Sequence, residues 1–376
     1  MKRAAVLLGL AGAGWLAARA FGLDGVAHSP VYAWLITALL GVGLYAAAFG
    51  IDLGEARAHL RTVLLAVTVG VIAKVAVIAV VVVGFYGDPR MLLLAVAVAQ
   101  IDPLSVAALR SRSRLSPSGV TLLSAWASFD DPVTVLLTAY LAGFVLPVEG
   151  DAGLGALDTG LGPFLLNLAL NALLAVVVIA AWRGFLWWKA RERPLSPRLR
   201  QAGRVVAALL VLAVAVFAVS QALLLALAVI GLFVRPRIDA VIDRVALVAL
   251  YSATFAIGMV VVVDRVTALT GVVLGAAAFF AQFLIALVLP ARGLSTSDRV
   301  SLAFAQQNGL TAIVLALLLE PVYPGAAGII AFAVLVINAT HAGIGLLRGP
   351  DVADPPPVLP PPRLRSVLRR RSAQRP

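Results

Sequence analysis

The sequence predicts an all-α polytopic membrane protein with about twelve transmembrane helices. Of its 376 residues, 62% are hydrophobic and 13% are charged, whereas soluble domains carry about 25% charged residues. Long apolar runs recur along the chain, as membrane-spanning segments require. The runs are continuous rather than alternating, which favours helices over the strands of a membrane β-barrel.

Twelve segments fit this description. The predicted spans cover residues 4–22, 31–51, 62–86, 91–109, 119–147, 160–187, 203–219, 222–235, 244–263, 267–290, 299–319 and 325–347. The seventh and eighth spans have an alternative, because residues 205–234 also fit one long tilted helix. Only the short polar sequence at 219–222 separates them.

Basic residues alternate between the connections, and this pattern predicts the orientation. Arg and Lys cluster at residues 55–61, 110–114, 189–204, 235–237 and 292–299. The alternate connections are poor in basic residues, as at 148–160, which holds three acids and no base. The positive-inside rule then places both termini in the cytoplasm, in a cell (inner or plasma) membrane. The net charge of +12 is therefore interpreted as a topology signal, and no nucleic-acid partner is predicted.

The two ends of the chain each allow two interpretations. The first span follows Lys2 and Arg3 and resembles a signal peptide, but Arg19 and the lack of a clear cleavage site favour a retained helix. Residues 348–376 are proline-rich, with six arginines after residue 362. This composition predicts a disordered cytoplasmic tail, either solvated or in contact with anionic lipid headgroups.

Two pairs of similar segments lie at the same separation. The sequence LYAAAFGI (44–51) shares five of eight residues with LYSATFAI (250–257), and AQIDPLS (99–105) is similar to AQQNGLT (305–311); both offsets are 206. The paired spans are seven apart, so the copies have opposite orientations in the membrane. Inverted-topology repeats are typical of secondary transporters.

The fourth and eleventh spans each contain a helix-breaking centre. Pro103 lacks an N–H, and the turn-like pair Asn308-Gly309 occupies the matching place. Broken backbone at membrane depth must line protein or a water-filled cavity. We therefore expect two crossing broken helices, with Asp102 neutralising the positive helix ends. The alternative is a simple proline kink beside a satisfied polar residue.

Asp130 and Asp131 are adjacent in the fifth span, where charge is costly. Successive helical residues point about 100° apart, so the two carboxylates are expected to face different neighbours. Pro132 also frees the carbonyl of Ser128, which would provide a hard oxygen ligand near the acids. Other candidate oxygen ligands nearby are the hydroxyls of Ser128, Thr134 and Ser105.

A buried carboxylate suits ion exchange. An apolar environment disfavours the charged form of the carboxyl group, so a proton and a metal cation compete for the same oxygens. This competition is the minimal chemistry of an antiporter. The alternative is a structural polar pair that is satisfied by its neighbours.

Lys74 lies deep in the third span, about twelve residues from either end. It is predicted to pair with Asp130 or another acid, although snorkelling to the interface is the alternative. Gln282 occupies a similar place in the tenth span, at an offset of 208. Asn167 and Asn171 are predicted to join helices by hydrogen bonds. His341 is expected to be a hydrogen-bonded structural histidine rather than a pH-sensitive group.

Three motifs resemble those of the monovalent cation/proton antiporter superfamily, the sodium/proton exchangers. They are AQIDPLSVAAL (99–109), SFDDPVTVLL (128–137) and SDRVSLAFAQQNGLTAIVLAL (297–317). The resemblance covers roughly residues 35–345. It implies that Asp131 is the ion- and proton-binding aspartate that holds Na⁺ or K⁺. Asp130 matches the variable first position of the motif, and Asp102 matches the aspartate of the broken helix.

The resemblance also implies a domain organisation. The antiporter domain would cover residues 1–347 and form a homodimer working by alternating access. Its core bundle would comprise approximately 62–147 and 267–347, with dimerisation or scaffold helices at approximately 4–51 and 203–263.

The sequence departs from both known charge pairings of this superfamily. Electrogenic members have a basic residue where Gln282 stands, and electroneutral members pair a Glu with an Arg where Trp126 and, approximately, Asn308 stand. The hypothesis is that Lys74 supplies the missing positive charge to Asp130.

The predicted function is therefore exchange of Na⁺ or K⁺ for protons, without a cofactor and without enzymatic activity. No P-loop or nucleophile elbow is found in the sequence. Two alternatives stay open: a non-transporting sensor or assembly protein on an antiporter fold, and an organic-anion symporter of related fold.

Overall fold

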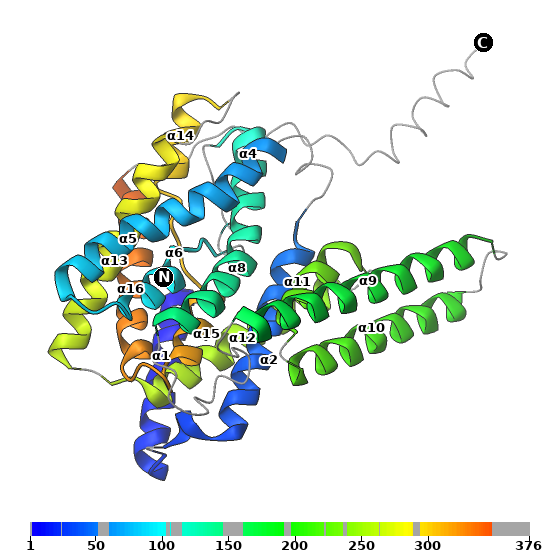
Figure 1. Ribbon diagram of the computed structural model, residues 1–376, viewed down its shortest axis with the longest axis horizontal. Coiled ribbons are helices and arrows are strands. Elements are labelled where there is room, and N and C mark those ends of the chain that lie inside the picture. Colours follow the sequence, from blue (N-terminus) through cyan, green and yellow to red (C-terminus); the bar gives the residue numbers. More distant parts are fainter. Residues whose placement is uncertain are drawn as a thin grey trace.

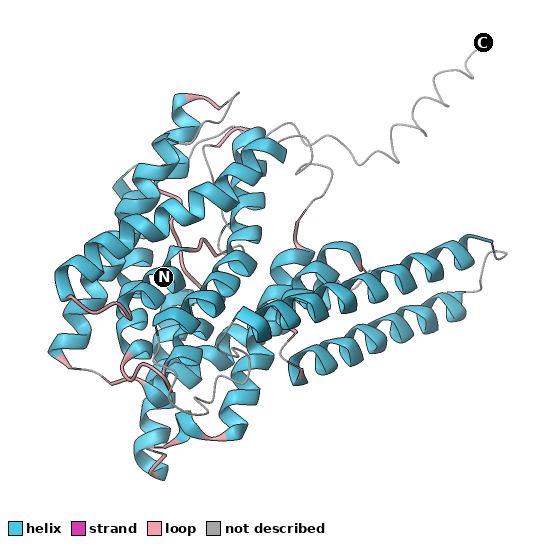
Figure 2. Ribbon diagram, in the orientation of Figure 1, coloured by secondary structure: helices cyan, strands magenta, loops and turns pink. Residues whose placement is uncertain are grey.

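The protein is helical throughout the part of the chain that the computed structural model describes, and no strand occurs there (Figure 2). The described residues are 2–23, 25–51, 60–102, 106, 115–145, 161–191, 197–221, 223–235, 239–262, 264–288 and 294–347. The predicted all-α class is therefore confirmed. The predicted tail, Pro103 and Ser105 lie outside the described residues.

The elements follow one another along the sequence as Figure 1 labels them. They are α1 (Lys2–Phe21), η1 (Val26–His28), α2 (Pro30–Phe49), α4 (Leu60–Leu65), the π-helical turn η2 (Ala66–Gly70), α5 (Val71–Tyr86), α6 (Met91–Ala99), α8 (Pro117–Val145), α9 (Leu161–Arg191), α10 (Pro197–Ser220), α11 (Leu224–Phe233), α12 (Asp239–Val260), α13 (Arg265–Val288), α14 (Thr296–Ala303), α15 (Leu310–Leu319) and α16 (Ala326–Leu347).

Seven of the helical segments in the described part of the chain are long and apolar enough to cross a membrane. The chain is therefore a multi-pass membrane protein. Shorter apolar helices accompany these segments, among them α11 and α15. A break also falls where the sequence predicts one, since α10 ends at Ser220 and α11 begins at Leu224. The total of twelve spans and the repeat relationship stay predictions.

Helix α6 ends inside the predicted fourth span, and the predicted eleventh span is an interrupted helix. Helix α6 ends at Ala99, and Gln100 has an extended backbone, with φ −73° and ψ 159°. Helices α14 and α15 are separated by residues 304–309. We call residues 100–102 the first break and residues 304–309 the second break. The second break is wider than the Asn308-Gly309 pair that the sequence indicated.

The helices pack in two groups that share α15. Helix α5 packs on α6 and α13, and α13 packs on α16; elsewhere α1 packs on α12, and α2 on α11. Helix α15 contacts α2 and α12 as well as α6 and α16. Helices α9 and α10 project from this bundle (Figure 1). The division into a core and a dimerisation domain stays a prediction.

Asn171 joins two of these helices, as the sequence predicted. Its Oδ1 accepts a hydrogen bond of 2.7 Å from the backbone N–H of Ala226 in α11. Its Nδ2 donates to the side chain of Asn167 over 2.8 Å. The two asparagines of α9 therefore form one polar joint with α11, where the first turn of the helix has backbone donors to satisfy.

Helices α1 and α12 cross with almost no space between their backbones. A Cβ added at Gly14 would collide with the backbone carbonyl of Phe255, and one at Gly258 would collide with that of Ala11. Small residues permit this close approach of membrane helices. The first helix thus packs closely against α12.

This crossing gives the first testable expectation. Gly14→Ala is expected to destabilise the protein by about 1–3 kcal/mol, because the added methyl group must push the helices apart. Gly12→Ala is the matched control in the same helix, since nothing lies within 4 Å of a Cβ there. Thermal unfolding in detergent should show a lower melting temperature for the first variant only. Equal behaviour of the two variants would contradict the tight crossing.

Asp298 fastens the start of α14 to the start of α8. Its carboxylate accepts hydrogen bonds from the backbone N–H and hydroxyl of Ser116, at 2.7 and 2.9 Å, and caps its own helix with Ser295. Burial alone would raise the pKa of Asp298, but these hydrogen bonds outweigh it and hold the pKa below the ordinary value of 3.8. The charged carboxylate is therefore the form that stabilises this joint.

The direction of that shift fixes a pH dependence. The contribution of Asp298 to stability is fully present above its ordinary value of 3.8 and is lost as the pH falls through the lower value of the folded state. Asp298→Ala is therefore expected to lower the melting temperature at neutral pH and to have a smaller effect in strong acid. Melting curves across this acid range test the expectation. An effect that grows towards low pH would refute it.

Candidate functional site

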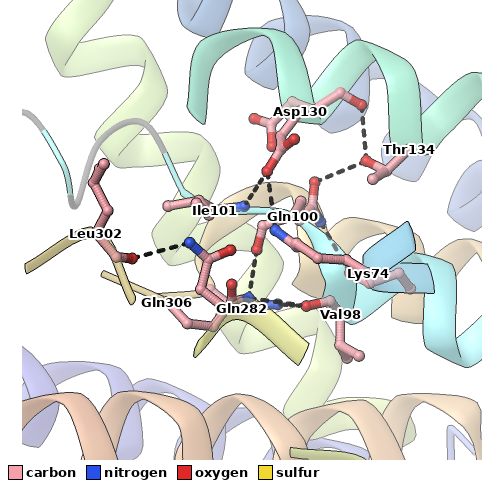
Figure 3. Close-up of polar contacts among 12 residues, drawn as sticks. Lys74, Val98, Gln100, Ile101, Asp130, Thr134, Gln282, Leu302 and Gln306 are labelled. Atoms are coloured by element: carbon pink, nitrogen blue, oxygen red, sulfur yellow. Dashed lines mark hydrogen bonds and ion pairs between the residues drawn. The ribbon is translucent and has the colours of Figure 1, made fainter. Parts of the chain in front are cut away.

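The two breaks cross and are hydrogen-bonded to each other. The backbone N–H of Asp102 donates to the carbonyl of Gln307 over 2.8 Å. Gln306 Nε2 donates to the carbonyls of Val98 and Gln100, at 3.1 and 2.8 Å (Figure 3). Gln100 and Gln306 are 206 residues apart, which is the offset of the sequence repeat. Each break thus supplies hydrogen-bond partners for some of the backbone groups that the other break leaves without intrahelical partners.

Asp130 is the centre of a buried ion pair. Its Oδ2 lies 3.3 Å from Lys74 Nζ, and both side chains are fully buried. The same oxygen accepts a hydrogen bond of 3.1 Å from the backbone N–H of Ile101 in the first break (Figure 3). The Lys74 ammonium also lies 5.4 Å from the centre of the Trp126 ring. The predicted pairing of Lys74 with Asp130 is therefore present, and it ties α5 and α8 to the first break.

Asp131 faces a different part of the protein, as the helical geometry predicted. Its Oδ2 accepts a hydrogen bond of 2.8 Å from the hydroxyl of Thr311 in α15. Its Oδ1 is buried and has no hydrogen-bond partner among the described residues. A buried carboxylate oxygen without a donor is costly, so this atom is suited to a proton or a cation.

Asp131 and Asp102 line one small cavity, about 10 Å³ in volume, between α2, α8, α12, α15 and the first break. Its other lining residues are small or apolar apart from Thr311. A cavity of this size has room for roughly one water-sized species. Gly309 stands close to Asp102, since a Cβ at this position would collide with the carboxylate. The sequence therefore needs glycine here for the second break to approach that aspartate.

The predicted supporting residues lie around the breaks with separate contacts. Thr134 Oγ1 is 3.1 Å from Gln100 Oε1 and 3.0 Å from the Asp131 carbonyl. Ser128 instead donates to the Ser124 carbonyl within α8, and α8 continues through Pro132. The hydroxyl of Ser128 is thus engaged in its own helix rather than with the acids.

Gln282 and Asn308 make their contacts at the second break. Gln282 Nε2 donates to the carbonyl of Leu302 over 3.0 Å, at the end of α14 (Figure 3). Asn308 Nδ2 donates to the carbonyl of Val98 over 3.0 Å and its Oδ1 accepts from Gln306. Gln282 therefore serves a helix end, whereas Lys74, its counterpart by sequence offset, serves a carboxylate.

Sequence reasoning missed Thr311, Gln100, Gln306 and Asn338 as members of this site. The first three stand within the repeated motifs, so their repetition was an available signal. Asn338 has no such signal, because nothing in its own segment marks it. Its Oδ1 accepts from the backbone N–H of Asn308, and its Nδ2 donates to the carbonyl of the same residue.

Thr311 gives a second testable expectation. Thr311→Val keeps the volume and removes the hydroxyl that donates to Asp131 Oδ2. We expect the half-saturating concentration of the transported ion to shift by about fivefold or more. This is the effect of losing a hydrogen bond to a charged group. Thr311→Ser is the control that keeps the hydroxyl. Identical transport by the Val and Ser variants would remove Thr311 from the site.

No protein-family model matches the sequence, and no curated protein matches it. The fold is similar to that of the sodium/proton antiporter MjNhaP1 from Methanocaldococcus jannaschii. The TM-score is 0.58 with 16% sequence identity, over 83% of this chain and 86% of that one. At this identity the likeness describes the fold.

Proposed function

We propose that the chain exchanges a monovalent cation, Na⁺ or K⁺, for protons across the membrane. The observation that carries the proposal is Asp131. This carboxylate is buried, has one oxygen without a partner among the described residues, and lines a small cavity beside two crossed breaks. A carboxylate in such a place binds either a proton or a cation, and the fold likeness to a sodium/proton antiporter agrees with this use.

The other charged residues take supporting roles in this proposal. Asp102 lines the same cavity as Asp131 and adds negative charge where the cation binds. Asp130 is engaged by Lys74 and Ile101, so it is the fixed member of the acidic pair. Thr311, which lines the same cavity, adds a hydroxyl oxygen, a ligand type that suits hard cations. Exchange then proceeds by alternating access, with the breaks as the moving centre.

The two other functions are weaker on the observations. A non-transporting sensor was suggested by the missing family ion pairs, but the Lys74–Asp130 pair supplies one positive charge in their place. An organic-anion symporter would need a positive cavity. The cavity here is lined by two aspartates, and no basic residue is among its lining residues.

Purified protein in proteoliposomes tests the proposal. An imposed pH gradient should drive uptake of Na⁺, K⁺ or Li⁺ together with dissipation of the gradient. Comparing the three cations gives the selectivity, which depends on the size of the cavity as well as on its ligands. A correctly folded wild type that moves none of them would favour the sensor, and uptake of an organic anion would favour the symporter.

The proposed assembly is a homodimer in a cell (inner or plasma) membrane with both termini in the cytoplasm. The motif positions and the loop charges support this arrangement. Labelling of single cysteines, introduced into a chain that has none, tests the orientation. Cysteines in the 148–160 and 189–204 connections should react from opposite sides of the membrane.

A further inference from the structure

The second break leaves backbone groups that must find partners. Residues 304–309 lie between the end of α14 and the start of α15, where helix ends leave carbonyls and N–H groups without intrahelical bonds. In a membrane each such group needs a partner within the protein. The partners of this break therefore show which elements hold it in place.

Helix α16 supplies partners at both ends of the break. Asn338 takes both backbone groups of Asn308, accepting from its N–H at 3.1 Å and donating to its carbonyl at 2.9 Å. His341 Nδ1 lies 2.8 Å from the carbonyl of Phe304, at the other end. A carbonyl only accepts, so Nδ1 carries the proton of this hydrogen bond. Asn338 and His341 are three residues apart and share one face of α16.

The remaining contacts show that these two residues have a distinct task. The middle of the break is held by the first break, through Asp102 and Gln307. The end of α14 is also held by Gln282, through the Leu302 carbonyl. Among the hydrogen bonds of the described residues, those of Asn338 and His341 connect both ends of the break to one helix, α16.

The first break has a comparable fastening, with different chemistry. There a residue of α8, Asp130, accepts from the backbone N–H of Ile101 and is charged and paired with Lys74. The fastening of the second break on α16 is made by an amide and an imidazole. The carboxylate of Asp130 can change its charge by taking up a proton, whereas the amide of Asn338 stays neutral.

We propose that Asn338 and His341 are positioning residues that clamp the second break to α16 and thereby hold Thr311 against Asp131. The clamp sets where α15 begins, and Thr311 lies in the first turn of α15. Its consequence for transport rests on the proposed function. Its consequence for the backbone of the break does not.

Hydrogen exchange measured by mass spectrometry on the whole protein tests the clamp without any transport. Asn338→Leu is expected to speed hydrogen exchange in peptides covering residues 304–309 by about tenfold or more, because it removes two partly buried hydrogen bonds to Asn308. His341→Leu should act likewise at the Phe304 end. Thr340→Val is the matched control, since Thr340 is an exposed residue of the same helix.

Two conservative variants separate positioning from general loss of stability. His341→Asn keeps a donor near the position of Nδ1 and is expected to restore wild-type exchange. Asn338→Asp offers both an acceptor and a donor only when its carboxyl group is protonated. Its exchange, relative to wild type at each pH, should therefore be fast at high pH and near normal at low pH.

Transport gives the last readout. Asn338→Leu should raise the half-saturating cation concentration more than it lowers the maximal rate, because it displaces Thr311 rather than removing Asp131. Unchanged hydrogen exchange in Asn338→Leu would overturn the clamp. Equal hydrogen exchange in His341→Asn and His341→Leu would also overturn it. If the wild type transports no cation but the variants show these changes in hydrogen exchange, the proposed function is refuted and the clamp stays supported.

Discussion

Asp131→Asn is expected to reduce cation/proton exchange to the level of liposomes without protein. The amide has nearly the size of the carboxyl group and still presents an oxygen to the hydroxyl of Thr311, which lies 2.8 Å from Asp131 Oδ2. It carries no negative charge and has no proton that it can release near neutral pH. The variant therefore removes the chemistry and keeps the shape.

The measurement is cation-driven proton movement in proteoliposomes, together with the melting temperature of the variant. Melting is expected to stay at or above that of wild type, because a buried charge without full partners is replaced by a neutral group. Asp88→Asn is the control, since Asp88 lies in the short connection between α5 and α6 and is paired with Arg90 at 2.9 Å. Exchange retained by Asp131→Asn would show that the ion binds elsewhere.

The difference between the two adjacent acids follows from their surroundings. Asp130 has a cation and a backbone N–H on one oxygen, so its negative charge is already balanced. Asp131 has one neutral hydroxyl donor and a neighbouring acid across the cavity. An arriving cation gains more from the unbalanced carboxylate. The roles proposed for the pair thus come from contacts rather than from their order in the motif.

Much of this site could be predicted from the sequence because its strongest signals are local. A charged residue within an apolar span is costly, so Asp130, Asp131 and Lys74 are conspicuous in the sequence alone. Helical geometry then separates the two acids, and the depth of Lys74 in its span predicts a buried partner. The helix-breaking Pro103 stands four residues after the end of α6, and Asn308-Gly309 lies within the second break.

The parts that could not be predicted depend on contacts between distant segments. Asn338 is an ordinary polar residue of an apolar helix until the second break is placed beside it. The extent of that break also depends on tertiary partners, since Phe304 leaves the helix where His341 and the aromatic side chains of α13 meet it. The role of Gln282 at a helix end needed the position of Leu302. Sequence periodicity contains none of this information.

Lys74→Met is expected to destabilise the protein by about 3–5 kcal/mol. Methionine nearly fills the space of the lysine stem but leaves Asp130 buried without its cation. The backbone N–H of Ile101 donates to the same Asp130 oxygen that Lys74 contacts, and this neutral donor cannot balance a full charge. Gln282→Met is the matched control. It removes a neutral buried side chain from the corresponding place in α13, and its expected cost is about 1–3 kcal/mol.

The double variant Lys74→Met/Asp130→Asn separates charge balance from packing. With both charges removed, no unpaired ion remains, and most of the lost stability should return, which a double-mutant cycle measures as a large coupling energy. Transport by this variant then shows whether the pair contributes charge to the cycle. If the pair contributes charge, the rate of cation/proton exchange should depend on an imposed membrane potential differently in the double variant and in the wild type. Asp131 is expected to bind the ion in both. No recovery of stability in the double variant would mean that Lys74 acts through its packing against Trp126 and not through Asp130.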